Sequence, residues 1–392
     1  MVVPVRDEEG TIAALLDSLL AQTRRPEEIV IVDGGSRDCT VKIIEEYARK
    51  DSRIRLIWTD GAFPGEGRNL GVQVASHDVI AFTDAGIRLN SRWLEKLCEP
   101  VEQDETVDVV YGHLEPITDT FFTECAALAY VPAPTEHERE RIRAPSIASC
   151  LMKRAVWESV GGFPPFRASE DLIFMEAIAQ GNYKIAYAPG AIVYWRIAPG
   201  WGATFRRFAS YSRHNLLAGR ARHWHYGVAR MYGAAAVFFA LAVVHSPLWA
   251  VVPFIGLVGR ALSIAYRKRG AFVFHDTFRP KRLLYLTGLL VLIDAATAWG
   301  FCVWVCKDRL RGSSAPQAPS PEPSPRGRGG NGSSGHKRTH ERNREGDPAV
   351  HPEHVPRTGG ADTGGGRYPT VFERHYRFLW GPGTHLVPGR HL

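Results

Sequence analysis

The chain has 392 residues, of which 45% are hydrophobic and 23% are charged, and its formal net charge is +7. This composition excludes a wholly disordered, collagen-like or fibrous protein, and the length allows two or three folded units or one large domain with appendages. A basic balance is typical of proteins that bind nucleic acid, an anionic membrane surface or a phosphorylated substrate. The six cysteines are scattered without a C-x-x-C pair, which indicates a reducing compartment rather than a disulfide scaffold.

The first 200 residues alternate short apolar runs with stretches of helical periodicity. The runs are rich in β-branched residues, which predicts buried strands at Val2–Val5, Ile29–Val32, Ile54–Trp58 and Val79–Thr83. Helices are expected between them at Thr11–Gln22, Thr40–Lys50 and Gly67–Ser76. This alternation predicts an α/β domain over residues 1–200, with a mostly parallel, Rossmann-like sheet covered on both faces. Because the chain enters a strand at once, we expect no signal peptide.

The second part of the chain is apolar. Its long stretches are Val228–Ser246, Pro247–Tyr266 and Leu283–Cys306. Each is long enough to cross a bilayer, which predicts membrane helices within residues 228–306. The alternative is a buried helical subdomain, which Arg230, Arg260 and Asp294 favour because charges in lipid are costly. The third stretch either spans the membrane or lies at its surface.

Charge is distributed unevenly along the chain. Residues 1–196 carry 31 acidic and 21 basic residues, which argues against nucleic acid as a partner, whereas residues 197–311 carry 3 acidic and 16 basic ones. The basic residues flank the apolar stretches and spare the Ser246-Pro247 link. The positive-inside rule therefore predicts a multi-pass protein of the cell membrane with a cytoplasmic catalytic domain. Residues 201–227 mix arginine with aromatic and aliphatic residues, as expected of an amphipathic interfacial segment.

The last part of the chain is of low complexity. Residues 312–392 hold 15 Gly and 11 Pro, about a third of the segment. We expect a disordered tail.

Acidic residues end two of the predicted strands. Asp33 is followed by a turn containing Gly35 and Ser36, and Asp84 is followed by Ala85. Ligands of open α/β sheets bind at the carboxyl ends of the strands. Asp33 can therefore accept a hydrogen bond from a base or ribose, and Asp84 can ligate a divalent cation that holds a diphosphate. The alternatives are a helix cap formed by Ser36 or Asp38 and a plain Asp-Ala-Gly turn.

Two further motifs carry charge at the start of helices. Arg68 either binds a phosphate near the nucleotide pocket or is a surface arginine. Glu170 and Asp171 follow Ser169 and precede an apolar helical face. They either cap that helix or supply a general base to a cleft.

As an ordered set, six motifs resemble those of the family 2 glycosyltransferases of the GT-A fold. They are Pro4-Val5-Arg6-Asp7-Glu8, Asp33-Gly34-Gly35-Ser36, Gly67-Arg68-Asn69, Thr83-Asp84-Ala85-Gly86, Gly161-Gly162-Phe163 and Glu170-Asp171. The resemblance covers residues 1–196. It implies inverting transfer of a sugar from a nucleotide-diphospho-sugar to a hydroxyl acceptor. Asp171, next to Glu170, would be the catalytic base, and Asp84 would hold Mg²⁺ or Mn²⁺. The donor-binding residues would be Pro4, Val5, Arg6, Glu8, Asp33, Gly35, Ser36, Arg68, Asp84 and Ala85. Candidates for contacts to the diphosphate or the acceptor are Gly162, Phe163, Arg207 and Arg213.

The sequence departs from the family pattern at several points. Gly86 stands where the metal motif usually has a second Asp, and Gly34 likewise replaces an Asp. The Gln-x-x-Arg-Trp signature of processive synthases is absent, which favours a single transfer. A cytoplasmic site beside a bilayer suggests a lipid or lipid-linked acceptor, in envelope or polysaccharide glycan synthesis. The alternative is a catalytically silent membrane subunit that binds a nucleotide sugar, which the two glycines favour.

Overall fold

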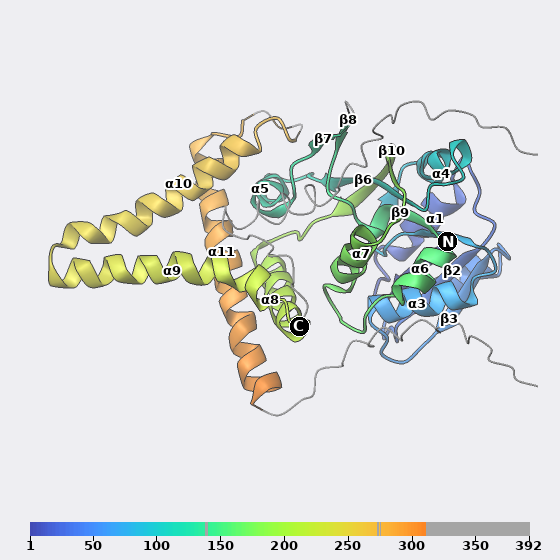
Figure 1. Ribbon diagram of the computed structural model, residues 1–392, viewed down its shortest axis with the longest axis horizontal. Coiled ribbons are helices and arrows are strands. Elements are labelled where there is room, and N and C mark those ends of the chain that lie inside the picture. Colours follow the sequence, from blue (N-terminus) through green and yellow to red (C-terminus); the bar gives the residue numbers. More distant parts are fainter. Residues whose placement is uncertain (138–139, 273, 275, 311–392) are drawn as a thin grey trace, which may run out of the picture. The chain divides into compact units, whose positions relative to one another are not determined.

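The computed structural model describes residues 1–310 apart from 138–139, 273 and 275, so the predicted tail at 312–392 lies outside the described residues. A sheet lies at the centre of the N-terminal part (Figure 1). It has eight strands in the order β3-β2-β1-β4-β9-β6-β10-β5. Its strands are β1 (Val2–Val5), β2 (Ile29–Asp33), β3 (Ile54–Trp58), β4 (Val79–Phe82), β5 (Ile87–Leu89), β6 (Val109–Ile117), β9 (Cys150–Lys153) and β10 (Ile185–Arg196). A separate pair is formed by β7 (Thr135–His137) and β8 (Glu140–Ile142).

The sheet is mixed but mostly parallel. Strands β1 to β4 run parallel to one another, and β6 runs parallel to β10. Strand β9 is antiparallel to both β4 and β6, and β5 is antiparallel to β10. The expected α/β architecture is therefore confirmed. The sheet also contains two strands, β5 and β9, that run antiparallel to their neighbours.

Helices cover both faces of this sheet, because alternate residues of the buried strands are apolar on both sides. One core contains Val3 and Ile31 and packs against α1 (Ile12–Leu20), α2 (Thr40–Ala48) and α4 (Trp93–Gln103). The other contains Val2 and Val30 and packs against α3 (Pro64–Val74), α6 (Arg154–Val160) and α7 (Glu170–Gln180). The two layers hold the carboxyl ends of β1, β2 and β4 at one edge.

Two helices begin earlier than the apolar pattern predicts. Helix α3 begins at Pro64 rather than Gly67, because proline suits the first helical position and Glu66 accepts a hydrogen bond from the Phe63 backbone N–H at 2.8 Å. Helix α9 (Ala221–Val244) begins seven residues before Val228. It follows α8 (Trp201–Leu217), and left-handed Gly219 (φ 72°) separates the two, so two helices share the predicted interfacial segment 201–227.

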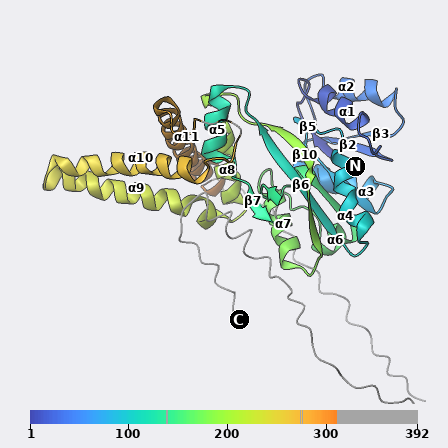
Figure 2. The ribbon, with the colours of Figure 1, turned by 90° about the horizontal axis from the view of Figure 1, so that it is seen from above.

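Among the described residues, three helical segments are long and apolar enough to cross a membrane: His225–Val244, Pro247–Arg267 and Pro280–Arg309. They correspond to α9, to the short η2 (Pro247–Ala250) with α10 (Val251–Arg267), and to α11 (Pro280–Trp304) with the π-helical turn η3 (Val305–Arg309). Figures 1 and 2 both show α9 and α10 lying side by side. This segment corresponds to the apolar region that the sequence predicts.

The charges within these helices are paired. Arg260 of α10 forms an ion pair with Asp294 of α11, with nitrogen–oxygen distances of 2.5 and 3.2 Å. The Tyr232 hydroxyl of α9 donates to the same carboxylate at 3.1 Å. Because charges are compatible with an apolar environment when they are paired, these residues do not favour the buried-subdomain alternative.

A third apolar core links the helices to the rest of the chain. It contains residues of α8, α10 and α11 together with α5 (Phe121–Tyr130). Helices α8 and α11 meet closely at Gly300, where an added Cβ would lie 2.6 Å from the Ser212 Cβ. The Ser212 hydroxyl also donates to the Thr297 carbonyl at 2.7 Å. Helix α8 is thereby fixed to α11, which is one of the candidate membrane helices.

Candidate active site

A cleft of about 960 Å³ opens at the carboxyl ends of β1, β2 and β4, and the starts of α3 and α7 together with helix α8 complete its wall. This is where ligands of open α/β sheets bind. Many of the residues selected from the sequence line it: Pro4, Val5, Arg6, Glu8, Arg68, Asp84, Ala85, Glu170, Asp171 and Arg207. The other selected residues lie behind the wall or elsewhere.

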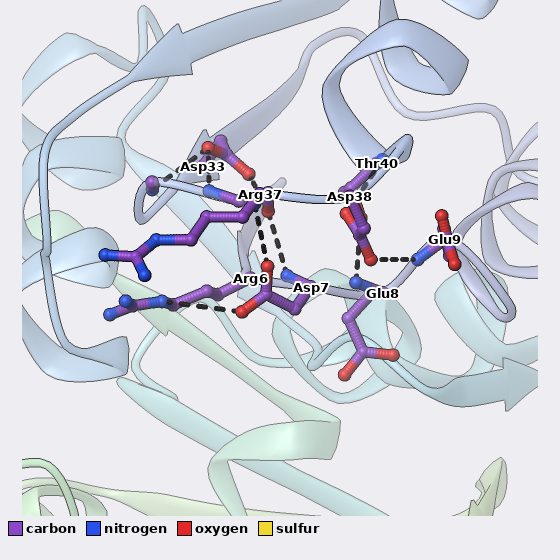
Figure 3. Close-up of polar contacts among 10 residues, drawn as sticks. Arg6, Asp7, Glu8, Glu9, Asp33, Arg37, Asp38 and Thr40 are labelled. Carbon is purple, nitrogen blue, oxygen red and sulfur yellow. Dashed lines mark hydrogen bonds and ion pairs between the residues drawn. The ribbon is translucent and has the colours of Figure 1, made fainter.

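Two loops at this edge are joined by hydrogen bonds between backbone and side chains (Figure 3). In the loop after β1, the Asp7 carboxylate accepts from the Arg37 backbone N–H at 2.8 Å. The Glu9 backbone N–H donates to Asp38 at 3.1 Å, and that of Glu8 donates to the Thr40 hydroxyl at 2.7 Å. These bonds hold the two loops in place, and the loops form the floor of the cleft on the β1–β2 side. Asp38 is one of the hydrogen-bond acceptors in this network.

Asp33 supports this floor from beneath. Its side chain is fully buried and accepts from the backbone N–H groups of Gly35 and Ser36 at 3.0 and 2.9 Å. At the next residue, Gly34, an added Cβ would lie 2.6 Å from the Ala62 carbonyl oxygen. The close approach of the Ala62 backbone explains why residue 34 carries no side chain. Asp33 holds the shape of the turn through its two hydrogen bonds and does not line the cleft.

Arg68 links two acidic motifs across the cleft. Its Nη2 donates to Asp84 at 2.6 Å and its Nη1 donates to Glu170 at 3.1 Å, while its side chain is only 4% exposed. The guanidinium also lies over the Phe163 ring, 5.3 Å from the centroid. Buried charges require such pairing, so Arg68 holds the end of β4 against the start of α7.

Glu170 and Asp171 are adjacent carboxylates in a confined place. Burial and the neighbouring Asp171 raise the pKa of Glu170 against the opposing effect of Arg68. Burial likewise raises the pKa of Asp171. Raised carboxyl pKa values are typical of groups that exchange protons with a substrate. Ser169, which precedes them, has a left-handed backbone (φ 75°) and makes no side-chain cap, whereas the Asp171 carboxylate accepts a hydrogen bond from the Leu172 backbone N–H at 2.8 Å in the first turn of α7.

Asn69 connects the Gly-Arg-Asn motif with the Gly-Gly-Phe motif. Its amide donates to the Phe163 carbonyl and accepts from the Phe163 backbone N–H, both at 2.8 Å. The Trp157 indole donates to the same side chain at 2.9 Å. Gly162 has a left-handed backbone (φ 75°) beside this amide, where a Cβ would lie 2.8 Å from its oxygen. Gly162 and Phe163 therefore form the support beneath Arg68, a role that the sequence motifs alone did not reveal.

Helix α8 supplies a wall that the sequence analysis identified only at Arg207. The cleft is also lined from this helix by Arg206, Ser210, Tyr211 and Asn215. Arg213 lies apart from them and forms two 2.8 Å hydrogen bonds with Asp308 of η3. Arg213 therefore joins α8 to the end of α11, while Arg206 and Arg207 are in the cleft.

Few protein ligands are available for a divalent cation at Asp84. Gly86 has a left-handed backbone (φ 75°), and a Cβ there would lie 3.6 Å from Glu8 Oε2. The Glu8 carboxylate therefore lies close to where the second Asp of the motif would begin. Within the part of the chain that the structure describes, no group of three or more His, Cys, Asp or Glu is arranged to hold a metal. This donor set fits Mg²⁺, which typically takes one or two carboxylates and completes its shell with water and substrate phosphates.

Comparison with known proteins gives a consistent result. The family model described as Glycosyl transferase family 2 matches residues 1–153. The glycosyltransferase EpsJ of Bacillus subtilis is 32% identical over 139 residues, which are 36% of this chain and 38% of EpsJ. The glycosyltransferase AglE of Haloferax volcanii is 25% identical over 201 residues, which are 49% of this chain and 64% of AglE.

The fold also has a solved counterpart. The mannosyltransferase PcManGT of Pyrobaculum calidifontis, in complex with GDP-Man and Mn²⁺, aligns with a TM-score of 0.51 and 20% identity, over 76% of this chain and 86% of that one. This likeness establishes the GT-A fold. The aligned region spans 38% of EpsJ, which is itself described as uncharacterized, so this likeness does not give the activity of the whole chain.

Proposed function

We propose that this chain, a glycosyltransferase whose residues 1–153 belong to family 2, transfers a sugar from a nucleotide-diphospho-sugar to an acceptor hydroxyl with inversion at the anomeric carbon. The observation that carries the proposal is the convergence of Asp84, Arg68, Glu170 and Asp171 in one cleft at the carboxyl ends of the strands. These residues come from three motifs spread over more than 100 positions. Their meeting supplies acidic and basic groups where a donor and an acceptor can lie together.

The proposed reaction is a direct displacement. Asp171 accepts the proton of the acceptor hydroxyl, and that oxygen forms a bond to the anomeric carbon as the bond to the diphosphate breaks on the opposite side. The electron pair leaves with the nucleoside diphosphate. The raised pKa of Asp171 makes its carboxylate a stronger base than an ordinary aspartate, which suits this role. Arg68 keeps Glu170 in place beside Asp171 and also orients Asp84.

Asp84, with Glu8 close to the same place, would hold a divalent cation. Bound there, Mg²⁺ or Mn²⁺ would neutralise negative charge on the diphosphate. PcManGT, whose fold is similar, was solved with Mn²⁺ and GDP-Man, which supports this part of the proposal.

The helices after residue 200 point to a membrane. The hairpin of α9 and α10 exposes large apolar side chains such as Val243, Val244 and Ile255, each more than 60% accessible, which burial in lipid would cover. We infer a multi-pass protein of the cell membrane with the cleft on the cytoplasmic side, as the flanking basic residues predict. We further propose a lipid or lipid-linked acceptor in glycan synthesis, which a cleft beside the bilayer favours. Carbonate and high-salt washes followed by detergent test the attachment, and release by salt alone would contradict it.

A screen of nucleotide sugars tests the donor. Thermal unfolding of the full chain in detergent, with each donor and with or without Mn²⁺, should show stabilisation by at least one nucleotide-diphospho-sugar. Release of nucleoside diphosphate in the presence of membrane lipid extract would then demonstrate transfer. Donor binding without release under every condition would favour the silent-subunit alternative, and the absence of any donor binding would contradict both.

A further inference from the structure

A second cavity lies outside the cleft, at the carboxyl-terminal end of β6. Its volume is about 330 Å³, within the range of small-molecule sites, and the residues that line it are all different from those of the cleft. We infer that this cavity binds a neutral saccharide, the sugar portion of a membrane-borne acceptor. The assignment to the acceptor rests on the proposed function, whereas the saccharide is inferred from the cavity itself.

Three segments of the chain enclose this cavity. Glu115, Pro116 and Thr118 come from the end of β6 and the residues after it. Pro134 belongs to the segment between α5 and β7. The remaining wall is the start of the connection between α10 and α11, which includes Phe272. The cavity therefore lies where the N-terminal domain meets the connection between two candidate membrane helices.

Glu115 is a fixed hydrogen-bond acceptor in this cavity. His113 Nε2 lies 2.6 Å from Glu115 Oε1, and His113 Nδ1 accepts from the Arg143 backbone N–H at 3.3 Å. A neutral His113 ring therefore carries its proton on Nε2 and donates it to Glu115. Arg143 Nη2 donates to the other oxygen of Glu115 at 3.0 Å. The Glu115 side chain is still 37% exposed, so its remaining lone pairs can accept hydrogen bonds from a ligand.

The charges at the cavity are balanced. Burial alone would raise the pKa of Glu115, but the hydrogen bond from His113 and the Arg143 guanidinium outweigh it and lower that pKa. Glu115 is therefore ionised at neutral pH, and the positive charge of Arg143 offsets it. An anionic ligand would be repelled by Glu115, and a cation would compete with the guanidinium already bound there. The cavity therefore favours an uncharged ligand.

The rest of the lining combines polar and apolar surfaces. The Thr118 hydroxyl can donate and accept hydrogen bonds, whereas Pro116 and Phe272 present ring carbons. The Phe272 ring is held in place because it stacks on Phe274 with centroids 5.2 Å apart and faces the Arg143 guanidinium at 4.8 Å. A sugar has hydroxyls that donate to a carboxylate and C–H groups that pack on rings, so its chemistry matches this lining.

The cavity is attached to the candidate membrane helices. The Ala271 carbonyl, just after α10, accepts from Arg143 at 3.1 Å. Lys268 follows the last residue of α10 and donates to the Leu128 and Val131 carbonyls at the end of α5, each at 2.7 Å. These bonds hold the α10–α11 connection against the N-terminal domain. A saccharide in the cavity would therefore lie beside the ends of these helices, where a lipid carrier would place it.

The cavity also lies on the side of the sheet away from the donor-binding strands. Strands β1 and β2 contribute to the cleft, whereas β6 and its neighbour β10 lie toward the other end of the strand order. Pro116 is the register partner of Trp195 on β10, and the Trp195 ring lies 5.7 Å from the guanidinium of Arg207 in the cleft. The β6–β10 pair thus contributes to both places, which favours the acceptor rather than the donor as the source of the saccharide.

Saturation-transfer NMR of the full chain, in a detergent without a sugar headgroup, tests this inference. The probes are the methyl glycosides of glucose, galactose, mannose and N-acetylglucosamine, with sn-glycerol 3-phosphate as an anionic comparison. We expect at least one glycoside to bind. Glu115→Gln should weaken that binding on the order of 10- to 100-fold, because a charged acceptor is lost. Thr118→Val keeps the shape but removes one hydroxyl, and should weaken it about 2- to 10-fold.

Two controls locate the bound sugar. Glu158→Gln, exposed on α6, and Asp171→Asn, in the cleft, should both bind the glycoside as the wild type does. Loss of binding in Asp171→Asn with full binding in Glu115→Gln would place the sugar in the cleft and overturn the inference. Failure of every glycoside to bind, or binding of glycerol phosphate alone, would overturn it too. Thermal unfolding identifies misfolded variants, and Thr118→Val carries the test if Glu115→Gln unfolds.

The assignment to the acceptor has its own readout. With an active donor and acceptor, Glu115→Gln should raise the KM for the acceptor and leave kcat nearly unchanged, because Glu115 lies outside the cleft. An unchanged KM would overturn this assignment. A wild type that binds a glycoside through Glu115 but transfers no sugar from any donor would contradict the proposed function, and the cavity would remain a saccharide site.

Discussion

The guanidinium of Arg68 and the carboxylate of Asp84 lie 2.6 Å apart, although Arg68 belongs to α3 and Asp84 follows β4, the next strand along the chain. The second nitrogen of Arg68 binds Glu170, so one buried arginine connects the end of β4 with the start of α7. Because the same carboxylates would face the donor, substrate binding and the protonation of this cluster should be linked.

The first prediction concerns the pH dependence of stability. Burial raises the pKa of Glu170 in the folded chain above its ordinary value of 4.5, so the folded state binds a proton that the unfolded state has already lost. Stability from this group is present below pH 4.5 and is lost as the pH rises toward the raised pKa. Glu170→Gln should therefore flatten the decline of Tm with rising pH.

Chemical or thermal unfolding between pH 4.5 and pH 9 checks this prediction. The exposed Glu158→Gln on α6 is the control and should follow the wild-type curve. A decline in Glu170→Gln as steep as that of the wild type would show that Glu170 does not control this dependence.

The second prediction concerns Asn69. Asn69→Ala removes three hydrogen bonds and leaves the Phe163 backbone and the Trp157 indole without their partner. We expect a loss of about 1–3 kcal/mol in the free energy of unfolding and weaker donor binding, since Phe163 lies beneath Arg68. Gln73→Ala, on the exposed side of the same helix, should change stability by less than about 0.5 kcal/mol. Equal effects of the two substitutions on unfolding and donor titration would contradict the role of Asn69.

The third prediction concerns the contact between α8 and α11. Gly300→Val places a side chain against the Ala209 carbonyl and Ser212, where backbone atoms leave no room. Overpacking of this kind typically costs about 1–3 kcal/mol, and displacement of α8 should also weaken donor binding in the cleft that this helix lines. Gly259→Val is the matched control, because nothing lies within 4 Å of a Cβ at Gly259 on α10. Unfolding in detergent and titration with a donor identified by thermal shift measure both effects, and intact donor binding in Gly300→Val would show that α8 and the cleft are independent.

Much of the site could be predicted from the sequence, because strand ends are local features. Asp84 follows an apolar run, and parallel strands present their carboxyl ends at one edge, so its place in the cleft was predictable from the pattern. Pro4, Val5 and Glu8, which also line the cleft, were implied by the family resemblance. The α/β fold is confirmed for the same reason. The start of α3 was less predictable, because Pro64 and Glu66 rather than the apolar spacing determine it.

Other features depend on contacts between distant segments and left no periodic signal. The pairing of Arg68 with Glu170 spans 102 positions, and the wall formed by α8 depends on its packing against Gly300. Arginines on α8 look alike in the sequence, yet Arg213 binds Asp308 while Arg207 lines the cleft. A signal for Asn69 was available, since asparagine is unfavourable within a helix unless its side chain has a specific partner.

The most direct test of the account is the activity of Asp171→Asn. The asparagine keeps the shape of the side chain but cannot accept the acceptor's proton. With a donor identified by thermal shift, transfer by this variant should fall by about 10²–10⁴-fold while the donor dissociation constant stays close to that of the wild type. Transfer at the wild-type rate by a folded Asp171→Asn protein would contradict the proposed mechanism.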